Sequence, residues 1–252
     1  MKSVKVSYII ITWNGLSFMQ GLLASMSKQL QRDDIEVLIV DNHSTDGTLE
    51  FLSREYPSLH PICLPENKGV AYARNIALKQ AKGRYLFIVD NDIRITDEAV
   101  EGMEHYLDSH SDVGICGCRL LSADGEVQDS CKPYPGIRAK LRSVLRPNAP
   151  SVYRTQMQGK EPFEPVYLIG ACQMIRREVY EAIGALDEVI FYGPEDCDYC
   201  LRARQNGWRV MYVPTLTMVH YCQRRTHANP FTRLGWRHLK ALFYFYWKYK
   251  KC

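Results

Sequence analysis

Two aspartates separated by one residue end a hydrophobic, strand-like segment. Asp90 and Asp92 follow the run Tyr-Leu-Phe-Ile-Val at 85–89. Residues i and i+2 of an extended chain point the same way, and carboxylate oxygens are ligands that Mg²⁺ and Mn²⁺ prefer. A diphosphate would complete the coordination shell of such an ion. Taken alone, the same pattern is also that of an Asp-rich turn.

Alternating strand-like and helix-like segments would position these carboxylates. Strands are predicted at 6–11, 37–40, 61–64, 85–89 and 113–121, and helices at 18–30, after 45–47, at 71–81 and after Thr96. This alternation indicates βαβ units and a parallel sheet, in which ligands bind beyond the carboxyl ends of the strands. The other polar residues at these ends are Thr12, Trp13, Asn14, Asp41, Asn42 and Asn91.

A second acidic group opens a predicted helix at 195–206. Glu195 and Asp196 are adjacent, so one of this crowded pair can have a raised pKa. Transfer to a hydroxyl group needs a base that accepts the hydroxyl proton. Acids in a first turn also complement the helix dipole, and Asp198 and Arg202 are spaced as an i,i+4 ion pair. The residues alone therefore leave a catalytic and a structural interpretation open.

The composition and the missing motifs exclude several classes of protein. Hydrophobic residues make up 46% and charged residues 24% of the 252 residues, which excludes disordered, collagen-like and coiled-coil proteins. There is no GxGxxG after the first strand, no GxxxxGK[ST] and no GxSxG, so dinucleotide, P-loop and hydrolase fingerprints are missing. Neither a membrane-spanning run nor a signal-peptide pattern is found, and a cytoplasmic protein is expected.

The basic residues are concentrated at the C-terminal end. From Arg224 onward there are eight basic residues and no acidic one, whereas the preceding part has 24 basic and 28 acidic residues. This distribution argues against a nucleic-acid-binding face on the body and predicts an anionic partner for the tail. On a helix the tail would carry one basic stripe: Arg233, Arg237, Lys240, Tyr244, Lys248 and Lys251. Such a helix either lies on an anionic membrane surface or docks on the body with its basic face in solvent.

A longer series of motifs resembles the family 2 glycosyltransferases, which use nucleotide sugars. In order, these are Ile-Thr-Trp-Asn at 11–14, Val-Asp-Asn-His-Ser-Thr-Asp-Gly-Thr at 40–48, Glu-Asn-Lys-Gly at 66–69, Ala-Arg-Asn at 73–75 and Lys-Gly-Arg-Tyr at 82–85, followed by 89–92, 170–176, 195–202, 207–208 and His220. The resemblance spans residues 4–225. Its details are closest to the rhamnosyl- and galactofuranosyltransferase branches.

The resemblance implies a fold and a role for each of these residues. The fold is α/β, of GT-A type: a Rossmann-like mixed, mostly parallel sheet flanked by helices, here with a C-terminal amphipathic helix. Asp196 becomes the catalytic base. Trp13 would stack on the base of the nucleotide or pack as a core aromatic, and Asp41 would accept a hydrogen bond from uracil or thymine N3–H. The residues expected to bind the nucleotide sugar are Thr12, Trp13, Asn14, Asp41, Asn42, Asn67, Arg74, Asp90 and Asn91. Those expected on the acceptor side are Gly170, Glu195 and Asp198, and those expected to bind metal are Asp90, Asp92 and His220.

The predicted function is an inverting glycosyltransferase that depends on Mg²⁺ or Mn²⁺. It would transfer sugar from a UDP- or dTDP-sugar to a glycan or lipid-linked acceptor in cell-surface polysaccharide synthesis, at the inner face of the plasma membrane. Residues 1–225 would form the catalytic domain, with a nucleotide-binding half at 1–121 and an acceptor-side half at 122–225, and 226–252 would form the basic aromatic helix. The proline-rich stretch 132–165 would cross over the site.

Two other functions are compatible with parts of the pattern. A sugar-phosphate nucleotidyltransferase requires a Gly-rich, basic loop after the first strand, where the chain has Trp13-Asn14-Gly15. A catalytically inactive nucleotide-sugar-binding partner would be expected to lack Asp92 or Asp196, and the chain has both.

Overall fold

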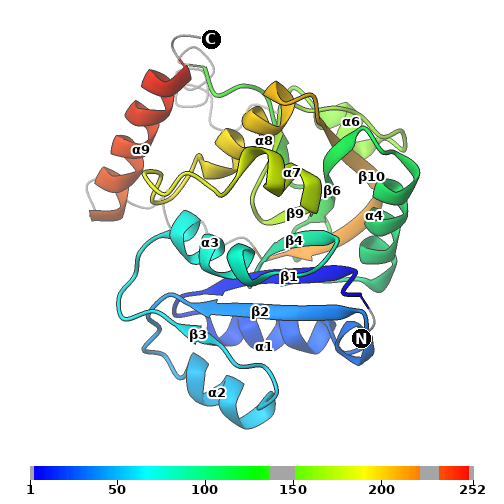
Figure 1. The fold of residues 1–252 in the computed structure, drawn as a ribbon. Helices are drawn as coiled ribbons and strands as arrows, with labels where there is room; N and C mark the ends of the chain where they lie inside the picture. The colour runs from blue at the N-terminus through cyan, green and yellow to red at the C-terminus, as the bar shows by residue number, and fades with distance from the viewer. Residues whose placement is uncertain (1–2, 137–150, 222–232, 250–252) are drawn as a thin grey trace.

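One sheet of eight strands organises the molecule. The computed structural model describes residues 3–136, 151–221 and 233–249. The strand order is β3-β2-β1-β4-β9-β6-β10-β5 (Figure 1). The bounds are β1 Val6–Thr12, β2 Ile35–Asp41, β3 Ile62–Cys63, β4 Tyr85–Asp90, β5 Ile93–Arg94, β6 Val113–Leu121, β9 Cys172–Arg176 and β10 Arg209–His220. A separate antiparallel pair consists of β7 (Cys131–Lys132) and β8 (Tyr167–Leu168).

The sheet is mixed and mostly parallel, as predicted. β1 runs parallel to β2 and β4, and β6 runs parallel to β10. Only β9 and β5 run against their neighbours, since β9 is antiparallel to both β4 and β6 and β5 is antiparallel to β10. The segment 167–176 is divided between β8 and β9, because the chain turns at 169–171.

Helices cover both faces of this sheet. They are α1 Leu16–Ser25, α2 Thr48–Glu55, α3 Val70–Gln80, α4 Asp97–Ser109, α6 Arg154–Gln158, α7 Arg177–Ile183, α8 Glu195–Gln205 and α9 Arg233–Tyr249, with a 3₁₀ turn at Gln29–Gln31. The predicted helix at 18–30 is therefore a helix followed by a separate turn. The helix predicted after Thr96 is confirmed as α4, and Thr96 caps it: Thr96 Oγ1 accepts a hydrogen bond from Ala99 N, and two acids follow in the first turn.

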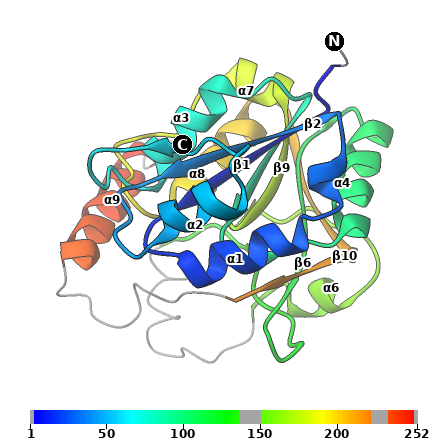
Figure 2. The ribbon, with the colours of Figure 1, turned by 90° about the horizontal axis from the view of Figure 1, so that it is seen from below.

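Side chains of alternate strand residues enter two separate cores. Tyr8 and Ile10 of β1 pack with α1, α2 and α4, whereas Ile9, between them, packs with α3 and α8. This alternation follows from the two-residue period of a strand. In Figures 1 and 2, α1 and α2 lie on one side of the sheet and α3 on the other. The strand ends therefore lie between the two layers of helices.

Helix α9 packs against the body through part of its predicted basic stripe. The Lys248 ammonium lies 2.5 Å from Asp198 and 2.7 Å from Asp187, and the Tyr244 hydroxyl donates to Asp187. Phe245 is fully buried beside them. The expected single basic face is thus wrong for Tyr244 and Lys248, because acidic side chains of the body bind this edge of the helix. The side chain of Arg233, and Lys251 as a whole, lie outside the described residues.

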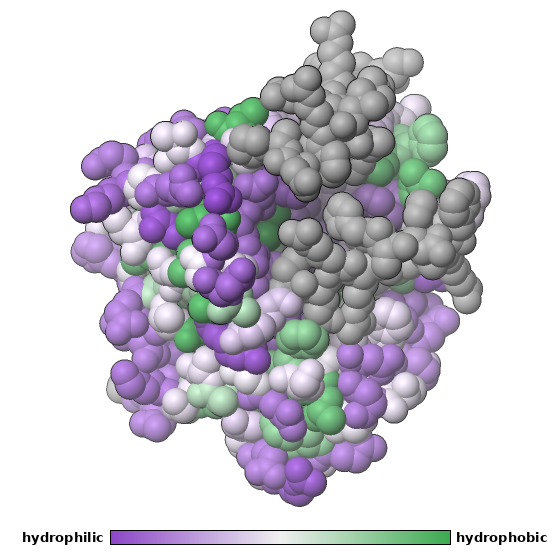
Figure 3. All heavy atoms as spheres, turned by 180° about the vertical axis from the view of Figure 1, so that it is seen from behind, coloured by the Kyte–Doolittle hydropathy of each residue, from purple (hydrophilic) through white to green (hydrophobic). Residues whose placement is uncertain are grey.

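The opposite edge of α9 is aromatic and open to solvent. Trp236, Phe243 and Trp247 are 58%, 75% and 68% exposed, and their spacing of i, i+7 and i+11 places them on one stripe. Leu239 and Lys240 are exposed on the same stripe. We call these five residues the aromatic face of α9. Hydrophilic residues predominate among the described ones on the surface in Figure 3, and none of the described helices is long and apolar enough to cross a bilayer.

Candidate active site

A cavity of about 340 Å³ opens where β1, β2 and β4 end. It brings together twelve of the fifteen predicted site residues, which come from both halves of the chain. Three others, Asn14, Asp41 and Asp198, do not line it. The twelve lining residues are Thr12, Trp13, Asn42, Asn67, Arg74, Asp90, Asn91, Asp92, Gly170, Glu195, Asp196 and His220.

A buried arginine joins the two predicted acidic groups. The Arg74 guanidinium, on α3, donates to Asp90 Oδ1 at 2.7 Å and to Glu195 Oε1 at 3.1 Å, and it also donates to the carbonyl oxygen of Gly170 at 2.8 Å. A Cβ atom on Gly170 would lie 2.6 Å from Arg74 Nη1, so the guanidinium fits only against a residue without a side chain. Arg74 is 3% exposed, so it does not lie on a solvated face of α3.

Burial shifts the protonation of the carboxyl groups around Arg74. Desolvation, reinforced by the charge of Asp196, raises the pKa of Glu195 to about 7, although Arg74 opposes this shift. Desolvation also raises the pKa of Asp90, with Arg74 lowering it and neighbouring Asp92 raising it. The expectation that one member of the Glu195–Asp196 pair has a raised pKa thus applies to Glu195.

Asp196 is held against the turn between β8 and β9. Its two carboxylate oxygens accept hydrogen bonds from Gly170 N at 3.0 Å and from Cys197 N at 2.7 Å. These bonds fix the carboxylate at the first turn of α8, where it lines the cavity and remains half-buried. The geometry leaves it accessible to an acceptor hydroxyl in the cavity.

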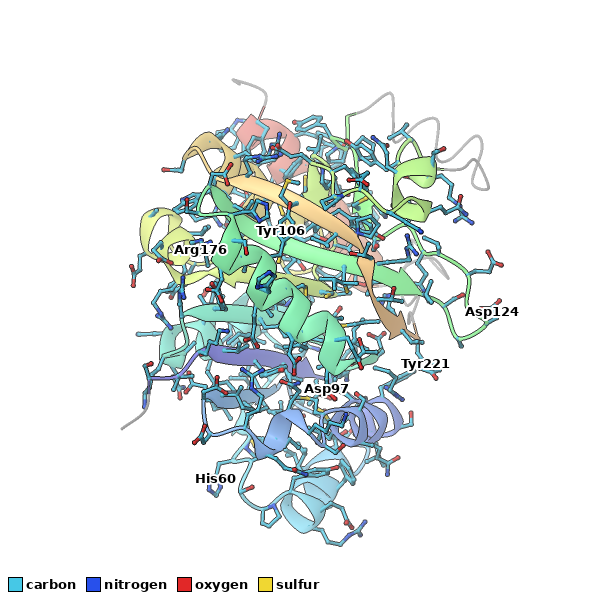
Figure 4. The ribbon with its side chains drawn as sticks, turned by 90° about the vertical axis from the view of Figure 1, so that its right-hand side faces the viewer. His60, Asp97, Tyr106, Asp124, Arg176 and Tyr221 are labelled. Atoms are coloured by element: carbon cyan, nitrogen blue, oxygen red, sulfur yellow. The ribbon has the colours of Figure 1, made fainter. Side chains whose placement is uncertain are left out.

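Asp92 and His220 form a second polar pair in the cavity wall. His220, at the end of β10, places Nε2 3.4 Å from Asp92 Oδ1, and the next residue, Tyr221, donates its backbone N–H to the carbonyl oxygen of Asp92. Figure 4 shows Tyr221 at this end of β10. Among the described residues, no group of three or more His, Cys, Asp or Glu side chains is arranged as a metal site. Asp90, the third predicted ligand, binds Arg74.

The asparagines after β1 and β2 organise the surrounding loops. Asn42 accepts a hydrogen bond from Lys68 N and donates to Asn67 Oδ1. Asn14, which has a positive φ of 46°, accepts from Thr45 N. Asp41 Oδ2 accepts from Ser44 N, which is the turn-closing contact expected of an Asx residue. Its other oxygen, Oδ1, is buried and accepts no hydrogen bond from a described residue.

Trp13 and a loop before α8 complete the wall. Trp13 is 39% exposed and lines the cavity, which rules out the core position considered for it. Phe191, Tyr192 and Gly193 also line the cavity, and sequence reasoning missed them. Their position just before Glu195-Asp196 was the available signal. His238 of α9 lies 2.9 Å from the carbonyl oxygen of Tyr192, so this part of the wall rests on the C-terminal helix.

Asp198 faces away from the cavity. Its side chain is fully buried and interacts with Arg202, Lys248 and Tyr249. The expected i,i+4 pair with Arg202 is confirmed at 2.9 Å, whereas the acceptor-side position is wrong for this residue. A step of two residues along a helix rotates the side chain by about 200°, so Asp196 and Asp198 point in nearly opposite directions.

The family is given by comparison of the whole sequence. The sequence model described as Glycosyl transferase family 2 matches residues 7–184, more than half of the chain. The chain is a family 2 glycosyltransferase. Membership of the family favours a glycosyltransferase over the sugar-phosphate nucleotidyltransferase considered from the sequence.

Relatives of known activity point to the branch that the motifs indicated. N-acetylglucosaminyl-diphospho-decaprenol L-rhamnosyltransferase of Mycobacterium tuberculosis is 26% identical over 247 residues, which cover 91% of this chain and 80% of the relative. dTDP-rhamnosyl transferase RfbF of Shigella flexneri is 29% identical over 216 residues, covering 84% and 67%. The resemblance to the rhamnosyltransferase branch of the family is thereby confirmed.

Solved structures confirm the GT-A-type fold. Staphylococcus aureus TarS 1–349 in complex with UDP-GlcNAc superimposes with a TM-score of 0.65 at 22% identity, over 89% of this chain and 60% of that one. The mannosyltransferase PcManGT from Pyrobaculum calidifontis, solved with GDP-Man and Mn²⁺, gives a TM-score of 0.62 at 22% identity, over 89% and 59%. The family 2 chain described here thus spans about 60% of the length of these solved chains.

Proposed function

We propose that this glycosyltransferase is inverting and metal-dependent, and that it transfers a sugar from a UDP- or dTDP-sugar to a glycan or lipid-linked acceptor in cell-surface polysaccharide synthesis. The observation that carries the proposal is that Asp196 shares one cavity with Asp92 and His220. A base for the acceptor and ligands for a metal–diphosphate therefore face the same space. The rhamnosyltransferase relatives support a dTDP-sugar donor and a polyprenyl-linked acceptor.

The nucleotide binds on the side of the cavity formed by β1 and β2. The exposed ring of Trp13 offers a stacking surface for the base. Asp41 Oδ1 accepts no hydrogen bond from the described part of the chain, and N3–H of uracil or thymine supplies a donor when the loop around Asn42 admits the base. Thr12 and Asn91, which are joined by a 3.0 Å hydrogen bond, lie next to the sugar-phosphate part of the donor.

The residues of the Asp92–His220 pair suit a divalent cation. A carboxylate oxygen and an imidazole nitrogen, both in the cavity wall, are donor types that Mg²⁺ and Mn²⁺ accept. Asp92 and His220 would hold the ion together with the diphosphate. If the Arg74 guanidinium moved from Asp90 to the phosphates, the Asp90 carboxylate could bind the ion as well. Such an ion, when bound, offsets the charge of the departing diphosphate.

Asp196 acts as the base of a single displacement. The acceptor hydroxyl gives its proton to the Asp196 carboxylate while its oxygen bonds to the anomeric carbon. The bond from that carbon to the diphosphate oxygen breaks, and the electron pair leaves with the nucleoside diphosphate. One displacement inverts the anomeric centre, and no covalent sugar–enzyme intermediate forms. Arg74 binds Glu195 beside the reacting groups.

A donor screen tests this function. The purified chain is incubated with a panel of UDP-, dTDP- and GDP-sugars and Mn²⁺, and release of the nucleoside diphosphate is measured with and without a polyprenyl-diphosphate sugar acceptor. Acceptor-dependent turnover of a UDP- or dTDP-sugar is expected, with an inverted linkage in the product. Preference for a GDP-sugar, or a product that retains the donor configuration, contradicts the proposal.

The aromatic face of α9 supplies a peripheral membrane contact at the inner face of the plasma membrane. Trp and Phe side chains together with lysine suit the boundary between headgroups and acyl chains, and α9 belongs to the part of the chain that has no acidic residue after Arg224. Arg237 of the same helix lies over Phe191, which lines the cavity. A bilayer on this face would therefore bring a lipid-linked acceptor close to the cavity.

A further inference from the structure

Both ring nitrogens of His220 face a polar side chain. Nδ1 lies 2.7 Å from Gln128 Oε1, and Nε2 lies 3.4 Å from Asp92 Oδ1. His220 is 6% exposed, so the ring is enclosed between these two side chains. Gln128 itself does not line the cavity, and its role is therefore separate from substrate contact.

The orientation of the Gln128 amide follows from a second hydrogen bond. Gln128 Nε2 donates to the backbone carbonyl oxygen of His220 at 2.8 Å. A carbonyl oxygen can only accept, so the NH₂ group must face it and the amide oxygen must face the ring. That oxygen can only accept as well, and Nδ1 of His220 must therefore carry the hydrogen. The unprotonated nitrogen is then Nε2, which faces Asp92 and the cavity.

The backbone around Gln128 keeps this amide in place. Residues 120–128 form a hairpin in which Gln128 N donates to Leu120 O and Ser122 N donates to Glu126 O, with a bridge between Leu121 and Val127. The strand that carries Leu120 is paired with the end of β10. Figure 4 shows the tip of this hairpin, at Asp124, on the same side of the molecule as Tyr221. One hairpin thus holds Gln128 against the last residue of β10.

We propose that Gln128 is a positioning residue that holds His220 in the Nδ1–H form, with the Nε2 lone pair directed at the metal position beside Asp92. The inference rests on the metal site of the proposed function and adds a residue that has no contact with substrate. Histidines that bind metals through one nitrogen regularly donate the other N–H to an oxygen that fixes their orientation. The amide oxygen of Gln128 accepts the Nδ1–H of His220, and the amide NH₂ group donates to the backbone carbonyl oxygen of His220.

The ring form of His220 can be measured in the metal-free protein without any variant. Two-bond ¹H–¹⁵N correlations of labelled histidines distinguish Nδ1–H from Nε2–H, and the spectrum of His220→Ala assigns the signal. His220 is expected as the Nδ1–H form in the wild-type chain. An Nε2–H form in the wild-type chain would overturn the proposal.

The variant Gln128→Met keeps the length of the side chain and removes both hydrogen bonds. It is expected to release the ring into a mixture of the two forms and to weaken Mn²⁺ binding in the presence of UDP by about 10–100-fold, measured by calorimetry. Gln29→Met is the matched control, since Gln29 is another glutamine whose amide makes side-chain hydrogen bonds, and it does not line the cavity. The control should leave Mn²⁺ affinity unchanged.

The outcomes separate this proposal from the proposed function. If His220→Ala loses Mn²⁺ affinity but folded Gln128→Met does not, the positioning role is refuted while the metal site stands. If His220→Ala itself retains full Mn²⁺ affinity, His220 is not a ligand and the proposed metal site is wrong.

Discussion

Lys248 and Asp198 form an ion pair at 2.5 Å that joins the last helix of the chain to the helix that carries Asp196. Asp198 is fully buried, and the Tyr249 hydroxyl donates to the same carboxylate at 2.9 Å. The C-terminal helix therefore supports the first turn of α8, two residues from the proposed base. Helix α9 therefore packs on the helix that carries the proposed base.

Removing this ion pair should destabilise the chain. Lys248→Met leaves the buried Asp198 carboxylate without one of its charged partners, which typically costs about 1.5–3 kcal/mol of unfolding free energy. Urea denaturation measures the loss. Lys240→Met, at an exposed lysine of the same helix, is the control and should have almost no effect. Equal stability of Lys248→Met and the wild-type chain would show that the ion pair adds nothing.

Replacing the proposed base should stop transfer but not donor binding. Asp196→Asn is nearly the same size and cannot take up the acceptor proton, so turnover is expected to fall by roughly 10²–10⁴-fold. Calorimetry with the nucleotide sugar should give an affinity close to that of the wild-type chain. If turnover stays near normal and Glu195→Gln is inactive instead, Glu195 is the base.

The raised pKa of Glu195 should appear in the pH dependence of stability. The pKa is about 7 in the folded chain and lower in the unfolded chain, so the folded state binds more protons between pH 4.5 and 7. The contribution of Glu195 to stability is therefore lost as pH rises through that window, by at most about 1.4 kcal/mol per pH unit. Glu195→Gln should become more stable relative to the wild-type chain between pH 5 and pH 7.5. A constant difference between the two chains over this range would mean that the pKa of Glu195 is not raised.

Chelation and loss of Asp92 should both weaken nucleotide binding. If the ion bridges Asp92 and the diphosphate, UDP affinity should fall roughly tenfold or more, about 1.4 kcal/mol, with EDTA or in Asp92→Ala. Asp124→Ala, in an exposed turn, is the matched carboxylate control. Unchanged UDP affinity in EDTA and in Asp92→Ala alike would contradict metal dependence.

The aromatic face of α9 should determine binding to vesicles. The wild-type chain is expected to sediment with phosphatidylglycerol vesicles, and the triple variant Trp236→Ser, Phe243→Ser, Trp247→Ser should remain in the supernatant because the apolar contact is lost. Since these side chains are exposed, the variant should keep its fold. A double variant, Val152→Ser with Val189→Ser, removes exposed apolar side chains elsewhere and should still bind. Self-association of the wild-type chain through this face, without vesicle binding, would assign it to a second copy instead.

Local pattern was sufficient to predict the strand ends and the caps. The hydrophobic run 85–89 ends at Asp90 in β4, and Thr96 caps α4, because these features depend on neighbouring residues. The same is true of the i,i+4 pair of Asp198 and Arg202. Six of the twelve site residues in the cavity, Thr12, Trp13, Asn42, Asp90, Asn91 and Asp92, reach it because the parallel strands β1, β2 and β4 end at the same edge of the sheet.

Contacts between distant segments could not be predicted in this way. Asp198 faces Lys248 across 50 residues of sequence, and helical periodicity does not say which side of α8 meets α9. The contacts of Arg74 with Asp90, Gly170 and Glu195 join three distant segments, and no local pattern predicts them. Gln128 has no motif, since its importance comes only from the pairing of its hairpin with β10.

The position of β9 has a consequence for synthesis of the chain on the ribosome. β9, at 172–176, fills the space between β4 and β6, which are both complete by residue 121. A nascent chain that ends between residues 122 and 171 therefore contains β4 and β6 but not the strand that pairs with both. Unpaired strand edges of this kind attract other chains. A fragment cut after residue 121 should aggregate for the same reason. The cavity is complete later still, because its lining includes Glu195, Asp196 and His220.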